Sequence, residues 1–201
     1  MGFTFQKTSG SWEVKGFELT CWRLDRFEVW PWGGCLIKER IFINTDIPLY
    51  SVSENSIYKD GSFSFLQAVA SGEVEGVTDA IVLQEILYSL IKKAGLSKGL
   101  AVFDFISCIV SDVFSITSED IFKLRELVEK YPDSSVRDLL HLSVMLDNEV
   151  SAIYTADNSF DMFAEIVRMD PVKFLKKGGK KKERHIFWFL DRNWRDIFMI
   201  F

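Results

Sequence analysis

The sequence predicts an α/β fold, a three-layer α/β/α sandwich around a mainly parallel sheet of four or five strands. Short apolar runs alternate with longer segments whose apolar residues recur every three or four positions, as strands alternating with helices do. The chain has 201 residues and is 48% apolar, which is enough for a sizeable core. Its best candidate for a membrane span, residues 100–116, is broken by polar residues at helical spacing. We therefore expect no association with a membrane.

The predicted elements follow one another from residue 41 to residue 169. The expected strands are a strand-like run at 41–50 and shorter runs at 74–78, 113–116, 151–155 and 167–169. The expected helices cover about 63–70, 80–93, 96–110, 118–130, 135–146 and 160–166. Gly72 and Gly95 are stop signals, Thr117 is an N-cap, and Pro132 breaks the chain between two helices.

Composition divides the chain into three parts. All six tryptophans lie before residue 33 or after residue 187, and a basic, glycine-containing run occupies residues 176–184. We expect a Trp-rich N-terminal extension of unknown role at 1–39, a central domain at 40–171, and a basic and aromatic tail at 172–201. The tail either contacts RNA or keeps the chain solvated, and its aromatic residues either stack on bases or join subunits.

Charge and cysteine content limit the classes of function. The net charge of -5 argues against a protein that holds nucleic acid by overall charge alone. The three cysteines have no CxxC spacing, and an odd number without a secretory signal favours a reducing compartment. We therefore expect a cytoplasmic protein.

Side chains able to bind a metal follow two of the predicted strands. Asn44 and Asp46 come at the end of the first, and Asp157 follows a later one, at the sheet edge where open α/β sheets bind ligands. Two residues apart, Asn44 and Asp46 share one side of the strand if the strand extends that far. Glu85 lies among apolar residues of a helix and Asp138 near a helix start. Oxygen ligands of this kind suit Mg²⁺ or Mn²⁺, although Asp138 is equally explained by the helix dipole.

Four passages together resemble the PIN domain family, the metal-dependent ribonucleases that include VapC-type toxins. They are residues 42–50, 77–87, 137–141 and 153–161, and they come in the family's order. The resemblance implies an endoribonuclease that uses Mg²⁺ or Mn²⁺, an RNA substrate, an antitoxin protein as partner, and a homodimer. Carried over residue by residue, it makes Glu85, Asp138 and Asp157 metal-site acids, with Asp161 as an auxiliary candidate.

The first motif departs from the family pattern of Asp, a small residue and Asn. Here the order is Asn44, Thr45, Asp46, so the first position offers a neutral amide oxygen and no charge. We therefore add Asp46 to the catalytic acids and both Asn44 and Asp46 to the metal ligands. Thr45 and Arg137 are the expected substrate-binding residues. His141, one helical turn beyond Asp138, is interpreted as a hydrogen-bonded structural residue in preference to a catalytic one.

Two functions follow from these residues, and a third concerns the ends of the chain. The leading one is a PIN-type endoribonuclease, acting as the toxin of a toxin-antitoxin pair, that cleaves RNA with metal-activated water. The alternative is a catalytically impaired PIN-like module that binds RNA or a protein partner. In the third, the aromatic ends assemble oligomers of a structural subunit.

Overall fold

The structure of the protein is a computed structural model that describes residues 5–8, 11–14 and 39–173. The chain divides into two units, residues 1–37 and 38–201. In the first unit, β1 (Phe5–Thr8) and β2 (Ser11–Val14) form an antiparallel ladder. Most of the predicted N-terminal extension, and all of the predicted tail beyond residue 173, lie outside the described residues. The expected roles of these two segments stay predictions.

The second unit is built on a five-stranded sheet in which every pair of neighbours is parallel. The strand order is β5-β4-β3-β6-β7, and the strands are β3 (Arg40–Ile43), β4 (Glu75–Asp79), β5 (Asp112–Phe114), β6 (Ala152–Tyr154) and β7 (Val167–Met169). The α/β class predicted from the alternating pattern is confirmed. No helix among the residues that the structure describes is long and apolar enough to cross a membrane.

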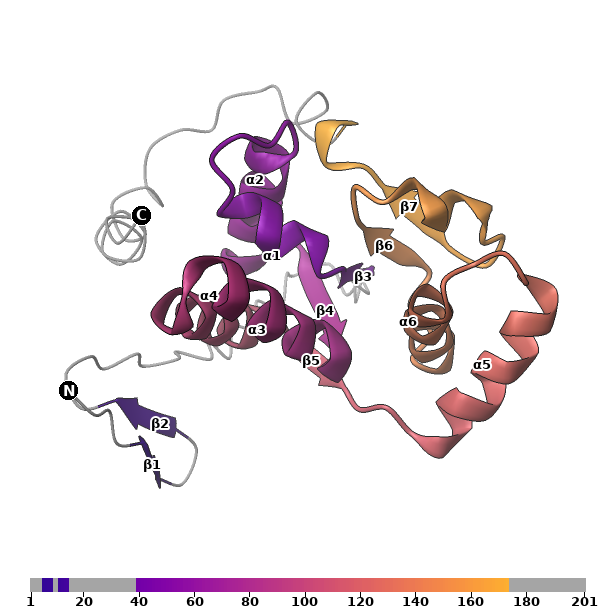
Figure 1. Ribbon diagram of the computed structural model, residues 1–201, viewed down its shortest axis with the longest axis horizontal. Helices are drawn as coiled ribbons and strands as arrows, with labels where there is room; N and C mark the ends of the chain where they lie inside the picture. Colours follow the sequence, from indigo (N-terminus) through magenta and orange to yellow (C-terminus); the bar gives the residue numbers. More distant parts are fainter. Residues whose placement is uncertain (1–4, 9–10, 15–38, 174–201) are drawn as a thin grey trace, which may run out of the picture. The chain divides into compact units, whose positions relative to one another are not determined.

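Helices surround this sheet, with the group α1 to α4 lying apart from the pair α5 and α6 (Figure 1). Their bounds are α1 (Asp46–Ser51), α2 (Lys59–Ala70), α3 (Ala80–Ala94), α4 (Leu96–Ile109), α5 (Ser118–Lys130) and α6 (Val136–Asp147). A 3-10 segment, η1 (Asn158–Met162), follows β6. Gly72 and Gly95 have φ values of 72° and 94°, which confirms both as helix stops because that conformation strains other residues. Thr117 is the N-cap of α5, as expected, and it forms a capping box with Asp120.

The first strand ends earlier than its sequence predicts. The strand-like run at 41–50 is wrong beyond Ile43, because the chain turns at Asn44 and α1 begins at Asp46. The backbone N–H of Asn44 still donates to the Tyr154 carbonyl of β6 at 3.3 Å, and then the N–H of Ile47 turns back to the carbonyl of Asn44. Pro48 lies in the first turn of α1, where no intrahelical N–H donor is needed.

The second departure lies after β6. The helix predicted at 160–166 is the single 3-10 turn η1, which starts at Asn158 and ends at Met162. Phe160 anchors the turn, because its ring is fully buried and contacts Phe163 edge to face at 5.6 Å. A short anchored turn keeps the side chains before it, those of residues 155–157, at the end of the sheet.

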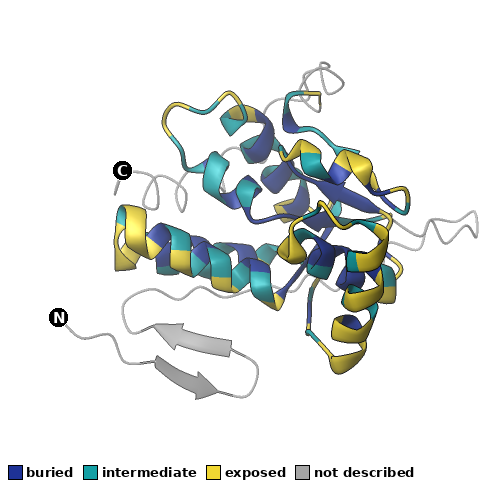
Figure 2. Ribbon diagram, turned by 45° about the vertical axis from the view of Figure 1, so that its right-hand side comes forward, coloured by how far each residue is buried: buried dark blue, intermediate teal, exposed yellow. Residues whose placement is uncertain are grey.

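The central strands carry the core. Phe42, Ile43, Val77, Ile153 and Tyr154 are completely buried. The strands of the sheet are largely dark blue, the colour of buried residues, in Figure 2. Burial on both faces accounts for the continuous apolar runs that identified these strands in the sequence. The core therefore lies directly beneath the edge where β3 and β6 end.

A buried hydrogen-bonded pair joins α6 to the end of β4. The Nδ1 atom of His141 lies 2.6 Å from Oδ2 of Asp79, and the two side chains are 1% and 0% exposed. The other oxygen of Asp79 accepts the backbone N–H of Val82 at 2.8 Å and so caps α3. His141 also packs against the ring of Phe42, 5.7 Å away. These contacts support the structural interpretation of His141.

Removal of this pair should destabilise the fold strongly. His141→Leu leaves the buried Asp79 carboxylate without its partner, and we expect a loss of about 3 kcal/mol or more in the free energy of unfolding. Urea titration of the full chain measures it. Arg125→Ala, which removes an exposed pair with Glu129 on α5, is the control and should cost under about 0.5 kcal/mol. A loss below about 1 kcal/mol for His141→Leu would contradict the prediction.

Candidate active site

Polar side chains meet where β3 and β6 end. These strands are parallel neighbours, with Ile43 opposite Tyr154, and the chain leaves β3 toward β4 on one side and returns to β6 on the other. The strand order therefore reverses between them, which is where open α/β sheets place their ligands. Residues 44–46 follow β3 and residues 155–157 follow β6.

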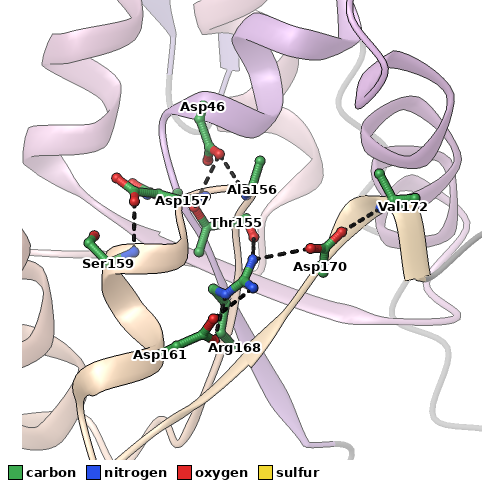
Figure 3. A network of polar contacts seen from close by, with 10 residues as sticks. Asp46, Thr155, Ala156, Asp157, Ser159, Asp161, Arg168, Asp170 and Val172 are labelled. Atoms are coloured by element: carbon green, nitrogen blue, oxygen red, sulfur yellow. Dashed lines mark hydrogen bonds and ion pairs between the residues drawn. The ribbon is translucent and has the colours of Figure 1, made fainter.

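The hydroxyl of Thr155 connects the two strand ends. It accepts hydrogen bonds from Nδ2 of Asn44 and from the backbone N–H of Asp157, both at 3.1 Å. It donates to Oδ2 of Asp46, also at 3.1 Å, and the backbone N–H of Ala156 donates to the same oxygen at 2.7 Å (Figure 3). Asn44 and Asp46 thus meet at one hydroxyl, although they do not lie along one extended strand as the sequence suggested.

The amide of Asn44 is engaged at both ends. Its oxygen accepts the backbone N–H of Thr45 at 2.8 Å, and its nitrogen donates to Thr155. Asp46 has one bonded oxygen and one, Oδ1, that is buried with no hydrogen-bond partner among the described residues. The carboxylate of the first motif is therefore the group with a free oxygen.

Burial sets the charge state of Asp46. Loss of solvent raises its pKa from 3.8 to about 6, and the negative charge of Asp157 adds to the rise. The hydrogen bonds from Ala156 and Thr155 act in the opposite direction. At neutral pH the folded chain thus holds Asp46 ionised against an electrostatic cost.

Glu85 of α3 reaches the same edge of the sheet. Its Oε2 accepts the hydroxyl of Thr45 at 2.5 Å, and its Oε1 lies 2.7 Å from Nε of Arg137 at the start of α6. The Glu85 side chain is 13% exposed, whereas that of Arg137 is 67% exposed. The two residues predicted to bind substrate therefore both contact Glu85.

Asp138 and Asp157 complete the group of acids. Burial raises the pKa of Asp138, and the charge of Asp157 raises it further, whereas the hydroxyl of Ser159, which donates to Asp138 at 3.3 Å, lowers it. Asp157 caps η1 by accepting the backbone N–H of Ser159 at 2.9 Å. The negative charge of Asp157 thus raises the pKa of both Asp46 and Asp138, so Asp157 interacts electrostatically with each of them.

Asp161 lies apart from this group. Its two oxygens accept Nε and Nη2 of Arg168 at 2.7 and 2.9 Å, and Arg168 lowers its pKa. The side chain is 56% exposed. Thr155 thus links Asn44 to Asp46, and Ser159 links Asp138 to Asp157. The auxiliary candidate Asp161 is instead bound to an arginine.

The donors at this edge have the chemistry that a hard cation requires. In the part of the chain that the structure describes, no three Asp, Glu, His or Cys side chains are close enough together to form a metal site. Asp46 nevertheless keeps a buried, unpaired oxygen, and two carboxyls have their pKa raised by a third. A divalent cation among these oxygens would relieve both penalties.

Two residues of the site have no counterpart in the sequence prediction. Thr155 follows β6 as Asn44 follows β3, so its place at the strand end was a usable signal. Arg168 gave no such signal, because its partners belong to η1 and to the turns beside β6 and β7. Asp79 lies within the family-like passage 77–87, but the sequence predicted no function for its carboxyl group.

The chain belongs to the PIN domain family, whose sequence pattern it matches over residues 43–166. It is 30% identical over 129 residues to a VapC ribonuclease of Mycobacterium bovis and to ribonuclease VapC13 of Mycobacterium tuberculosis. Each match covers 64% of this chain and 98% of the relative. The resemblance predicted from four motifs is thereby confirmed.

Solved structures agree on the fold. VapBC2 of Rickettsia felis, bound to a promoter DNA fragment, matches with a TM-score of 0.53 and 17% identity over 65% of this chain and 98% of that one. DNA-bound VapBC of Salmonella typhimurium gives 0.51 and 14%, over 66% and 98%. At these identities the match concerns the architecture alone.

The raised pKa of Asp46 predicts how its removal changes stability with pH. A carboxyl whose pKa is about 6 when folded and 3.8 when unfolded binds its proton more tightly in the fold, so its ionisation opposes folding as pH rises from about 4 to 6. In metal-free buffer, Asp46→Asn should therefore raise the free energy of unfolding at pH 8 by up to about 3 kcal/mol and leave it nearly unchanged at pH 4. Urea unfolding at both pH values measures this difference.

Asp161→Asn is the matched control, because Arg168 lowers the pKa of Asp161. A carboxyl whose pKa is lowered in the fold stabilises the fold at pH values above its unfolded-state pKa. Asp161→Asn should therefore lose stability at pH 8 and lose less at pH 3. An Asp46→Asn gain that is equal at pH 8 and pH 4 would contradict the assignment of Asp46.

Proposed function

We propose that the protein is a metal-dependent endoribonuclease of PIN type and the toxin of a toxin-antitoxin pair. The observation that carries the proposal is the meeting of Asn44 and Asp46 with Thr155, which follows β6, at the switch point of a PIN-family sheet. The names of the two mycobacterial relatives, which the chain covers over 98% of their length, support a ribonuclease. RNA is the proposed substrate.

Asp46, Glu85, Asp138 and Asp157 are the proposed acids of the metal site, with Asn44 as a neutral neighbour. Mg²⁺ or Mn²⁺, when bound, supplies an activated water and stabilises the leaving oxygen of the phosphodiester. Asp161 is left out of the set, because both of its oxygens bind Arg168.

Asp46 provides the charge that Asn44 lacks. Thr155 and Ala156 hold its Oδ2 and leave Oδ1 free, so the carboxylate is oriented by bonds that do not consume its second oxygen. Asn44 supports this arrangement from the other side of the same hydroxyl. The usual order of acid and amide is reversed, but the number of charges is kept.

Arg137 and Thr45 keep their proposed roles toward the substrate. The guanidinium of Arg137 is mostly exposed beside Glu85, where it can meet a phosphate. The Thr45 hydroxyl fixes the other oxygen of Glu85. Glu85 is already paired with Arg137, so a metal ion at Glu85 would have to compete with this pair. The pair is the observation that favours the alternative, an impaired module that binds RNA or a protein.

Partners and location follow the same proposal. An antitoxin protein and a second copy of this chain are the proposed partners, in line with the VapBC complexes that share its fold. The cytoplasmic location predicted from the cysteines stays a prediction.

An exchange of the two side chains tests the role of Asp46. With labelled RNA and Mn²⁺, Asp46→Asn should slow cleavage about 100-fold or more, since a charge at the metal site is lost. The double variant Asn44→Asp with Asp46→Asn restores the usual family order and should recover much of the rate. Gel analysis of initial rates measures both, with EDTA as the metal-free control.

Asp60→Asn, at an exposed acid of α2, is the matched control and should cleave at the wild-type rate. An Asp46→Asn variant as fast as the wild type would refute the role given to Asp46. A silent wild type that Asn44→Asp activates would instead establish the impaired module.

A further inference from the structure

Arg168 of β7 makes an extensive set of polar contacts below the acidic site. Its side chain is only 7% exposed and points toward the end of β6 (Figure 3). Nε and Nη2 donate to the two oxygens of Asp161, at 2.7 and 2.9 Å. Nη1 donates to the Thr155 carbonyl at 3.2 Å and to Asp170 at 3.3 Å. One guanidinium thus joins three separate segments.

These contacts hold both ends of the turn that presents Asp157. Thr155 stands at its start and Asp161 in η1 at its end, and Arg168 bonds to each. The turn delivers the backbone N–H of Ala156 to Asp46. A shift of either end would therefore move Asp157 and the bond that orients Asp46.

The fork of contacts on Asp161 requires an arginine. A guanidinium presents planar, parallel donors that match a carboxylate, whereas a lysine offers only a point charge. Removing a guanidinium from water costs several kcal/mol, so pairs of this kind add little net stability for their size. What the contacts do provide is a fixed geometry on the side of the turn opposite Asp46.

We propose that Arg168 and Asp161 form a positioning pair that fixes the turn at 155–161 against Asp46, so that metal affinity depends on two residues that do not contact the ion. This inference rests on the proposed metal site. It gives Asp161 a role through Asp157 and Thr155, in place of direct ligation.

Metal affinity, measured without any cleavage assay, tests the pair. Mn²⁺ is titrated calorimetrically into the full chain as wild type, Asp161→Asn, Arg168→Gln and the double variant. Each single change should weaken binding by about 10- to 100-fold, as loss of outer-shell partners does at metal sites. The double variant should bind Mn²⁺ about as tightly as the single variant with the lower affinity, because both changes break the same contact.

Direct ligation by Asp161 gives a different pattern. Arg168→Gln would then release the carboxylate for the ion and leave Mn²⁺ affinity equal or higher, and Asp161→Asn would still weaken binding in that background. Either result overturns the proposal. A third result also overturns it: a variant melts at a lower temperature than the wild type, yet binds Mn²⁺ with wild-type affinity when measured well below its melting temperature. The pair would then contribute to stability only.

Lys130→Gln is the matched control. Lys130 pairs with Glu165 at 2.6 Å, between α5 and the segment after η1, without contact to the turn, so Mn²⁺ affinity should not change. Should Arg168→Gln fail to fold, Arg168→Lys keeps the charge without the fork and takes its place in the cycle. A wild type that binds no Mn²⁺ refutes the proposed function and this inference with it, whereas tight binding by every variant refutes the inference alone.

Discussion

The hydroxyl of Thr155 is the point at which two neighbouring strand ends are held together, and the arrangement of the acidic site depends on it. It takes hydrogen bonds from Asn44 and from the backbone of Asp157, and it gives one to Asp46. A hydroxyl can serve three partners at once because it has one donor and two acceptor positions. The side chain is buried, so each of these bonds is shielded from competing water. Arg168 holds the carbonyl of the same residue from below.

Ionisation of the carboxyl groups at this edge of the sheet destabilises the folded state. Asp46 and Asp138 are each harder to ionise than a free aspartate, because burial and the charge of Asp157 both act against them. Glu85, by contrast, contacts the Thr45 hydroxyl and the Arg137 guanidinium. Functional sites commonly give up stability in this way, and an ion of opposite charge recovers it. The buried pair of Asp79 and His141 fastens α6 to β4 beneath these acids.

Periodicity was enough to predict most of the fold. The helices α3 and α5 and the strand β7 begin and end within about one residue of the predicted bounds, because local signals such as Gly95 and Thr117 mark them. The end of β3 was missed although Pro48 was a usable signal, because proline cannot donate to a strand ladder but suits the first turn of a helix. Four family motifs located the acids. The contacts of Thr155 and Arg168 could not be predicted, because Thr155 and Asp46 are 109 positions apart and meet only through the strand order.

The shared hydroxyl also bears on how an exchanged first motif can arise. Starting from the usual order of acid and amide, a single substitution produces either two acids or two amides at positions 44 and 46. Two acids would place like charges around one hydroxyl, while two amides would leave the end of β3 without a charge. Because both side chains already bond to Thr155, either intermediate keeps a polar contact there, and a second substitution completes the exchange.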